Sequence, residues 1–448
     1  MFRPGQLRLS EQLFRPVDPV VFRSNKPKND PRTGGTVGGL DLGDCDSLDS
    51  VNVAERSSAS QLSALLESPE IGRLVADLEA TRWTGRPGFP IKTMIGLALT
   101  KSLFAIPTWS RVVALVADHW KLQRILGCEG SPPSQWSAYR FASKLRENSG
   151  ALERCIDSVV EGLKAKLPDY GTDLAIDASD MPAFANGQRF ASKDGPERDW
   201  HSDPDASWGH RSAVSTRKGG GFFGFKLQMA CCTATGLPVA WTVETARANE
   251  SMFAAPLIDM SKRRGALAAT AAMDRAYDIG RVYEECADRD CEAIVPLRQT
   301  TAVKRGEHLP PSCSHGVWIF AGADRKRRAA KWRCPTGECE PASTWIKADR
   351  LHPLMPRESK RWKAAYRRRA AIEREFGRLK HEWALAPLRV RGRDRVRLHA
   401  DLTILTKLAC ALARARAVAN SRPRPRFGNG RVVRPPASSR ALSATRRE

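Results

Sequence analysis

The chain has 448 residues, 42% of them hydrophobic, which is enough for two or three domains with sizeable cores. Its formal net charge is +24, and residues 357–448 alone hold 26 Lys and Arg against 7 Asp and Glu; this charge fits a nucleic-acid partner and a basic tail that aids solubility equally well. The 11 irregularly spaced cysteines argue against a secreted disulfide framework, and neither a signal peptide nor a membrane-spanning apolar run is apparent, so we expect a soluble cytoplasmic protein.

The first third of the chain divides into two parts. Residues 1–57 contain Gly- and Pro-rich stretches and predict an irregular N-terminal segment. From residue 58 to 165, apolar residues recur at helical spacing, as in Leu62, Leu65 and Leu66. This second part predicts an all-α module.

The pattern changes after Leu167-Pro168, where short apolar runs alternate with helical patterns. Residues 182–220 are rich in Gly, Asp, Ser and Arg and predict a long loop. Helices are predicted at 251–262 and 279–288, and strands at 174–179, 222–233, 238–245, 268–273 and 293–297. This order predicts an α/β fold, a mixed sheet flanked by helices.

The C-terminal part begins with residues 300–357, rich in Pro, Cys, Trp and Lys, which predict a small β-rich insertion. One long helix is predicted over 359–383 and another over 402–418. Residues 420–448 form a basic tail, which we expect to be disordered because Pro removes hydrogen-bond donors and like charges repel. The sheet-containing domain is therefore predicted to span 166–419, with the insertion inside it.

The helix predicted at 359–383 carries a row of polar residues. Tyr366, Arg369, Glu373 and Lys380 fall within about 60° of one another at about 100° per residue, beside an apolar stripe. A single glutamate among arginines usually forms a surface ion pair that contributes little to stability, but an ordered row of polar residues is harder to explain in that way. Glu375 points about 200° away from Glu373, so we expect it to matter little.

Two aspartates match this row. Asp177 follows Leu174-Ala175-Ile176, and Asp274 follows Ala271-Ala272-Met273, so each is predicted at the end of an apolar strand. Alone, each is explained equally well as a turn or a helix cap. Together with Glu373, they offer hard oxygen ligands from separate elements, which is what a two-metal site for phosphoryl transfer requires.

These motifs resemble those of bacterial insertion-sequence transposases with a DDE catalytic core. Tyr366-x2-Arg369-x3-Glu373-x6-Lys380 matches the Tyr–Arg–Glu–Lys signature of that family. Four weaker likenesses, in the same order as in the family, are Gly85-Arg86-Pro87, Ile176-Asp177-Ala178-Ser179, Phe223-Gly224-Phe225-Lys226-Leu227 and Asp274-Arg275-Ala276-Tyr277-Asp278. The second and fourth of these carry Ala where the family usually has Gly or Ser, and Ala is small enough for the same close approach. The resemblance covers about residues 60–415.

The resemblance implies an RNase H-like catalytic domain in which Asp177, Asp274 and Glu373 are the catalytic acids and hold two Mg²⁺ or Mn²⁺ ions. It implies that the helical module binds DNA ends or mediates dimerisation. The protein would bind the terminal inverted repeats of its element as a homodimer, cleave the double-stranded DNA there and join the ends to target DNA, in a bacterial cytoplasm close to the nucleoid. The residues expected to contact DNA are Tyr366, Arg369, Lys380, Lys226, Arg389, Arg391, Arg393, Arg395 and Arg397.

In related enzymes a tryptophan of the insertion stacks on a flipped base near the cut. Trp318, Trp332 and Trp345 are the candidates here, although packing in a small β core explains any one of them better.

Two other functions stay open. An RNase H-like nuclease that only cuts would not need the Tyr–Arg–Glu–Lys row or the helical module. A domesticated DNA-binding protein without catalysis would be expected to have lost an acid, and none is lost.

Cys313, His315, Cys334 and Cys339 raise the question of zinc. Their arrangement, Cys-x-His and Cys-x4-Cys, is near but not at the usual ligand spacing. Ordinary thiols and one exposed histidine are therefore the favoured interpretation, with zinc as the alternative.

Overall fold

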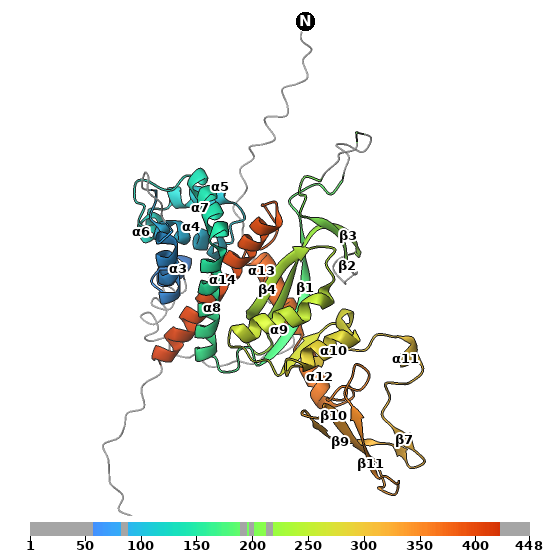
Figure 1. The fold of residues 1–448 in the computed structure, drawn as a ribbon. Coiled ribbons are helices and arrows are strands. Elements are labelled where there is room, and N and C mark those ends of the chain that lie inside the picture. Colours follow the sequence, from blue (N-terminus) through green and yellow to red (C-terminus); the bar gives the residue numbers. More distant parts are fainter. Residues whose placement is uncertain (1–56, 82–87, 189–194, 197–200, 212–217, 422–448) are drawn as a thin grey trace, which may run out of the picture. The chain divides into compact units, whose positions relative to one another are not determined.

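The computed structural model describes residues 57–81, 88–188, 195–196, 201–211 and 218–421 (Figure 1). Nearly all of the predicted irregular segment, the Gly85-Arg86-Pro87 motif and the tail after residue 421 lie outside the described residues. Residues from 53 onward belong to one compact unit, which holds all of the described helices and strands.

Helices occupy the part of the chain from Ser58 to Lys166. Ser57, Thr108 and Ser134 each precede a helix and accept a hydrogen bond from a backbone N–H of its first turn, which explains where those helices begin. The helices are α2 (Ser58–Leu66), α3 (Pro69–Glu79), α4 (Ile91–Leu103), α5 (Trp109–Asp118), α6 (Trp120–Leu126), α7 (Gln135–Glu147) and α8 (Ser149–Lys166).

The predicted mixed sheet with flanking helices is confirmed. Its strands are β1 (Asp173–Pro182), β2 (Ser207–Arg211), β3 (Gly220–Cys232), β4 (Pro238–Thr245), β5 (Thr270–Met273) and β6 (Glu292–Ile294). The order is β2-β3-β1-β5-β6, with β4 also paired to β3. β3 is antiparallel to β1 and β4, whereas β5 is parallel to β1 and β6. The helices that follow β4 and β5 are η1 (Glu250–Phe253), α9 (Ala254–Arg263), η2 (Arg275–Tyr277) and α10 (Gly280–Ala287).

Two predictions about strands are wrong. The loop predicted over 182–220 contains β2, which pairs with the start of β3. β2 alternates between exposed and half-buried residues and so lacks the apolar pattern of a core strand. Asp177 does not end its strand either, because β1 continues to Pro182 by pairing with β3 as far as Gly224.

Two predictions about helices also need correction. The helix predicted over 359–383 is two helices, α12 (Lys360–Arg367) and α13 (Ala370–His381). Between them, the amides of Arg368 and Arg369 bond to the carbonyls three residues back, which tightens the turn and bends the chain. The last helix, α14 (Arg393–Ser421), begins well before the predicted residue 402.

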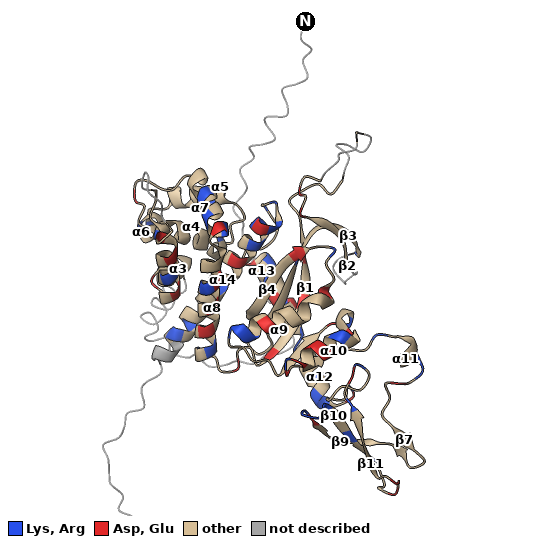
Figure 2. Ribbon diagram, in the orientation of Figure 1, with Lys and Arg blue, Asp and Glu red and all other residues tan. Residues whose placement is uncertain are grey.

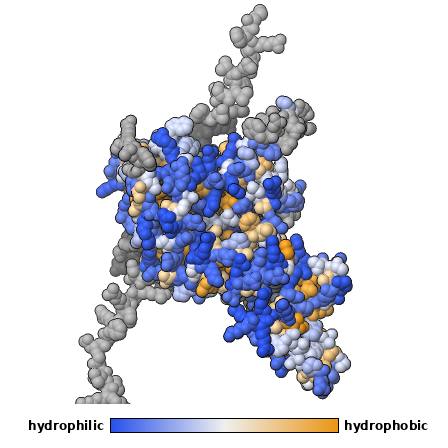
Figure 3. Space-filling model, viewed as in Figure 1, coloured by the Kyte–Doolittle hydropathy of each residue, from blue (hydrophilic) through white to orange (hydrophobic). Residues whose placement is uncertain are grey.

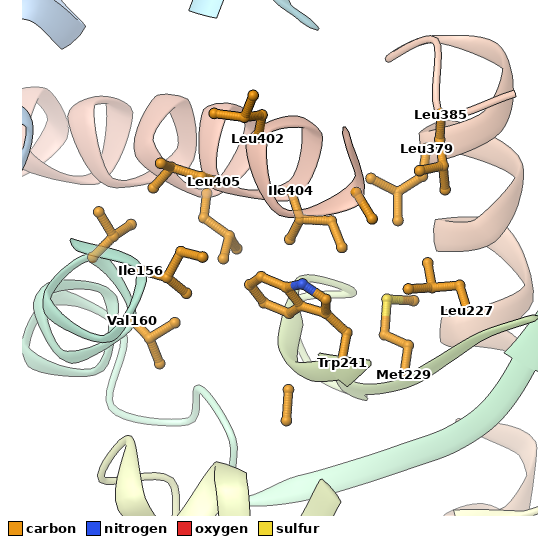
Figure 4. Packing of buried hydrophobic residues seen from close by; sticks show 14 of the residues in the cluster. Ile156, Val160, Leu227, Met229, Trp241, Leu379, Leu385, Leu402, Ile404 and Leu405 are labelled. Atoms are coloured by element: carbon orange, nitrogen blue, oxygen red, sulfur yellow. The ribbon is translucent and has the colours of Figure 1, made fainter. Parts of the chain in front are cut away.

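α14 joins the helical part of the chain to the sheet. Trp241 of β4 lies between Ile156 and Val160 of α8 and Leu405 of α14 (Figure 4). The indole N–H of Trp241 donates to the Asp401 carboxylate of α14 at 2.7 Å, so the buried polar atom is satisfied. Residues of α2–α8, the sheet, α13 and α14 belong to one continuous hydrophobic core.

The region between β6 and α12 is β-rich, as predicted for residues 300–357. It holds α11 (Thr301–Lys304), β7 (Ser312–Cys313), β8 (Gly316–Val317), β9 (Ile319–Asp324), β10 (Ala329–Arg333) and β11 (Ser343–Lys347). β10 is the central strand of a three-stranded antiparallel sheet, and β7 and β8 form a separate hairpin. None of the described helices is both long and apolar enough to cross a membrane.

Candidate active site

Asp177 and Asp274 come from neighbouring parallel strands. In the register of β1 and β5, Ile176 pairs with Met273. Asp177 is the next residue within β1, and Asp274 directly follows the end of β5. Adjacent strands lie about 5 Å apart, so the two aspartates occupy neighbouring positions. The negative charge of Asp274 accordingly contributes to the raised pKa of Asp177.

Backbone amides hold one oxygen of each aspartate. Asp274 caps η2 by accepting from the amide of Ala276 at 2.7 Å, and Asp177 accepts from the amide of Ala178 at 2.8 Å. One oxygen of Asp274 therefore does cap a helix, which is one of the two interpretations that the sequence left open.

Arg369 ties the third acid to the first. Its Nη1 donates to Asp177 Oδ2 at 2.8 Å, and its Nη2 donates to Glu373 Oε1. Arg369 and Asp177 are half-buried, whereas the Glu373 side chain is 57% exposed. The structure thus brings Asp177, Asp274 and Glu373 to one region although α12 and α13 are not one helix.

Burial raises the pKa of Asp177 to about 7, with the Arg369 charge lowering it and the charges of Asp274 and Glu250 raising it. Burial is thus the main cause of the raised pKa, and the neighbouring acids add to it. Glu250 is an acid that the sequence analysis missed. Glu250 lies in η1 and accepts a hydrogen bond from Lys226 Nζ at 2.6 Å. Lys226, which we expected to contact DNA, thus forms an ion pair with Glu250 in this structure.

Tyr277 is a second residue that the sequence left without a role. It is completely buried, and its hydroxyl has no hydrogen-bond partner among the described residues. Burial raises its pKa well above the usual value, and the charges of Asp177, Glu250 and Asp274 add to the effect.

The remaining members of the predicted polar row lie on either side of this site. Lys380 Nζ donates to the backbone carbonyl of Asp180 at 2.6 Å and approaches its carboxylate at 3.6 Å. Arg211 of β2 donates to the same carboxylate at 3.0 Å. Tyr366 stacks on Trp362 within α12, with the ring centroids 5.2 Å apart.

Glu375 does not behave as expected. It is 1% exposed and pairs with Lys407 of α14 at 2.9 Å. The expectation that it matters little is wrong for the fold, because a helix that packs on two sides has no free face at that position.

The five arginines expected to contact DNA divide into two groups. Arg393 and Arg397 already approach acids, Glu244 at 3.6 Å and Asp401 at 3.8 Å. The other three line a cavity of about 670 Å³ together with two arginines of α7, and no acidic residue is among the described residues that line it. We call these five residues the basic cavity: Arg140, Arg146, Arg389, Arg391 and Arg395.

The three tryptophans of the insertion differ in exposure. Trp332 is buried against Phe320, with the ring centroids 5.7 Å apart. Trp318 is half-buried. Trp345 is 44% exposed, and the cationic groups of Arg327 and Lys331 each lie 5.8 Å from its ring. Trp345 is thus the most exposed of the three.

By fold and site, the chain is a basic α/β protein with carboxylates gathered where β5 ends beside β1. Residues 171–406 match the family described as "Transposase DDE domain", which is more than half of the chain, and the chain therefore belongs to this family of transposases. The matched segment contains Asp177, Asp274 and Glu373.

One solved structure that the chain resembles is piggyBac transposase in its synaptic complex with hairpin DNA, determined by cryo-electron microscopy. The identity is 11% and the TM-score 0.36, and the likeness covers 81% of this chain and 76% of that one. No curated protein matches the sequence.

Proposed function

We propose that this transposase cleaves DNA at the ends of its own element and joins those ends to target DNA, with Asp177, Asp274 and Glu373 as its catalytic acids. The observation that carries the proposal is the placement of Asp177 beside Asp274, with Arg369 holding Glu373 to Asp177. Carboxylates of three separate elements converge, which a chance set of surface acids would not do.

The strand order supports an RNase H-like fold for the catalytic domain. β4, β3 and β1 run antiparallel in that spatial order, and β5 and β6 continue the sheet parallel to β1. β1 is therefore the central strand, and Asp177 lies near the middle of it.

Divalent ions fit the donor set. Carboxylate oxygens are the ligands that Mg²⁺ and Mn²⁺ prefer. Asp177, Asp274 and Glu373 would hold a pair of such ions, which supplies activation of the attacking oxygen and stabilisation of the leaving oxygen. Arg369 bridges Asp177 and Glu373 with its single positive charge, and Lys226 pairs with Glu250.

The basic side chains would bind the DNA phosphates. The basic cavity combines arginines of α7 with those that lead into α14, so both the helical part and the catalytic part would hold the DNA backbone. Tyr139 of α7 lines the same cavity, and its ring is 46% exposed. We extend the proposal to a homodimer in the DNA complex and to an insertion sequence of a bacterial host, as the resemblance implies.

The test is an assay with purified protein, Mg²⁺, labelled DNA that carries the element's own ends, and a supercoiled target. We expect cleavage at the ends and covalent joining to the target, both lost in Asp177→Asn and Asp274→Asn. Cleavage without joining would favour the nuclease alternative, and binding without either reaction would favour the domesticated DNA-binding protein.

A further inference from the structure

Three thiols and one imidazole meet in the insertion, outside the acidic site. The ligand atoms of Cys313, His315, Cys334 and Cys339 all lie within 4.8 Å of one another. Cys313 Sγ and Cys334 Sγ are 3.8 Å apart, and His315 Nδ1 lies 3.4, 3.7 and 4.0 Å from the sulfurs of Cys339, Cys334 and Cys313.

These separations are those of ligands around one tetrahedral zinc ion. With Zn–S of about 2.3 Å and Zn–N of about 2.05 Å, a tetrahedron separates two sulfurs by about 3.8 Å and a sulfur from a nitrogen by about 3.6 Å. A disulfide would require sulfurs about 2.05 Å apart. The observed distances therefore fit a shared metal and not a bond between the thiols.

The backbone presents the four residues from two short segments. Cys313 ends β7 and pairs with Gly316 of β8, so His315 lies in the turn of this hairpin. Cys334 follows β10 directly, and its amide donates to the carbonyl of Ala342 at 3.0 Å, which closes the loop that contains Cys339. Two-residue strands have little stability of their own, and the cluster adds a side-chain link between this hairpin and the loop after β10.

A carboxylate fixes the protonation of the imidazole. His315 Nε2 lies 3.2 Å from Glu338 Oε2. This contact favours a ring proton on Nε2, so that Nδ1, which faces the three sulfurs, can act as a ligand. Metal-ligating histidines in proteins commonly have such a carboxylate partner on their second nitrogen.

The insertion also needs a stabilising element besides its core. The main hydrophobic core contains none of the described residues between 300 and 357. Apart from two prolines, the buried apolar side chains described in that range are Val303, Ala329, Ala330, Trp332, Cys334 and Met355. Hydrophobic residues reach its surface instead, among them Val317 at 61% exposure and Ile319 at 46%. Figure 3 shows hydrophobic residues at the molecular surface among the hydrophilic ones. Small β-rich segments with so little core commonly depend on a bound metal or on disulfides.

We propose that Cys313, His315, Cys334 and Cys339 bind one Zn²⁺ ion as a closed structural site. Four protein ligands leave no open position, which distinguishes a structural zinc from a catalytic one. Binding displaces the three thiol protons and leaves His315 neutral. The site selects its metal separately from the acids, because thiolates and imidazole prefer zinc whereas carboxylates prefer Mg²⁺.

The zinc site would organise the sheet that carries Trp345. Cys334 follows β10 directly, and Lys331 of β10 pairs with Trp345 of β11. Loss of the metal should therefore loosen the insertion and leave the acidic site folded.

The test uses the full chain without an affinity tag, purified under reducing conditions with no metal added. Elemental analysis should find one zinc per chain. Replacement of that zinc by Co²⁺ should give the visible absorption of a tetrahedral site and a thiolate-to-cobalt charge-transfer band. Cys339→Ser should lose the zinc, whereas Cys128→Ser, a buried cysteine of the helical part, should keep it.

The zinc content and cobalt spectrum of the wild-type protein test the proposal even if a variant does not fold. Wild-type protein with well below one zinc per chain and no cobalt spectrum would overturn it, as would Cys339→Ser with a full complement of zinc. Limited proteolysis gives an independent readout: removal of zinc should expose cleavage sites between residues 300 and 357 and leave the rest of the chain protected.

Discussion

At the scale of single residues, Arg369 decides how the acidic site is held. Its two terminal nitrogens contact carboxylates of β1 and α13, which would repel each other without a cation between them. The spacing within the polar row predicts that Arg369 and Glu373 are neighbours. It does not predict the contact with Asp177, because that contact depends on how α13 packs on the sheet.

Glu373→Gln is expected to abolish strand cleavage and to leave binding to the element's ends nearly unchanged. The amide keeps the size of the side chain but removes the anionic charge of a ligand to a hard metal ion. A lost ligand should lower the cleavage rate by orders of magnitude. Mg²⁺-dependent cleavage of labelled end DNA, with gel-shift binding in parallel, measures both effects.

The matched control is Glu382→Gln, because Glu382 follows the same helix and is exposed. It should cleave at the wild-type rate. A Glu373→Gln variant that cleaves normally would remove Glu373 from the set of catalytic acids.

Glu375→Gln is expected to destabilise the protein, in contrast to what the sequence suggested. The change leaves Lys407, 6% exposed, without its anionic partner in the core. Breaking a buried pair by removing one member costs about 3–5 kcal/mol, and the amide should recover part of this loss. Urea unfolding measures the change in the free energy of unfolding.

The pair Glu375→Leu with Lys407→Met should restore much of that stability, because apolar residues of similar volume replace a buried ion pair at little cost. A single variant as stable as the wild type would mean that water reaches Lys407.

At the scale of secondary structure, the sequence predicts the elements that have an apolar face. The helices from 58 to 165 and the strands around Asp177 and Asp274 are of this kind. β2 has no such face, since it is an edge strand with exposed Trp208. The break between α12 and α13 carries no Pro or Gly that would mark it, and hydrogen bonding at Arg368 and Arg369 produces it.

The proposed zinc ligands Cys313, His315, Cys334 and Cys339 are likewise brought together by the fold and not by their sequence spacing. Within each half, the Cys-x-His and Cys-x4-Cys spacings depart from common zinc motifs, and β9 and β10 separate the two halves along the chain. Only the pairing of the strands brings the hairpin of His315 next to the loop of Cys339. Sequence reasoning therefore identified the residues and could not supply the distances on which the zinc proposal rests.

Trp345→Ala is expected to weaken the complex with a base-flipped or nicked end by about 1–3 kcal/mol, the usual contribution of one stacked base. Its exposed ring and the flanking cations favour stacking on a nucleobase. A fluorescent base analogue near the cut reports stacking directly.

Trp120→Ala is the control, because Trp120 is 71% exposed but lies in α6, outside the insertion. Trp332→Ala should instead destabilise the insertion, because Trp332 is buried there. Equal quenching of the base analogue by wild type and Trp345→Ala would exclude Trp345 as the stacking residue.

At the scale of the whole molecule, the sequence predicts the total charge directly, but it does not predict where the charged side chains lie or which of them form ion pairs. The count over 357–448 indicates a basic region, and Figure 2 shows Lys and Arg spaced along α14 and around α12 and β10. Which of these charges stay unpaired depends on the fold. Arg393 and Arg397 approach acids that come from β4 and from α14 itself, whereas Arg389 and Arg391 flank the ring of Phe184.

The basic cavity should account for part of the salt dependence of DNA binding. Each phosphate contact that is lost lowers the slope of log K against log salt by about one unit, so Arg389→Gln, Arg391→Gln and Arg395→Gln together should lower it by about three. Arg393→Gln and Arg397→Gln should each lower it less, because those side chains are already paired with acids. Arg289→Gln, whose guanidinium pairs with Asp259 at 2.7 Å between α10 and α9, should leave the slope unchanged. Titrations at several salt concentrations measure these slopes, and a triple variant with the wild-type slope would place the DNA elsewhere on the molecule.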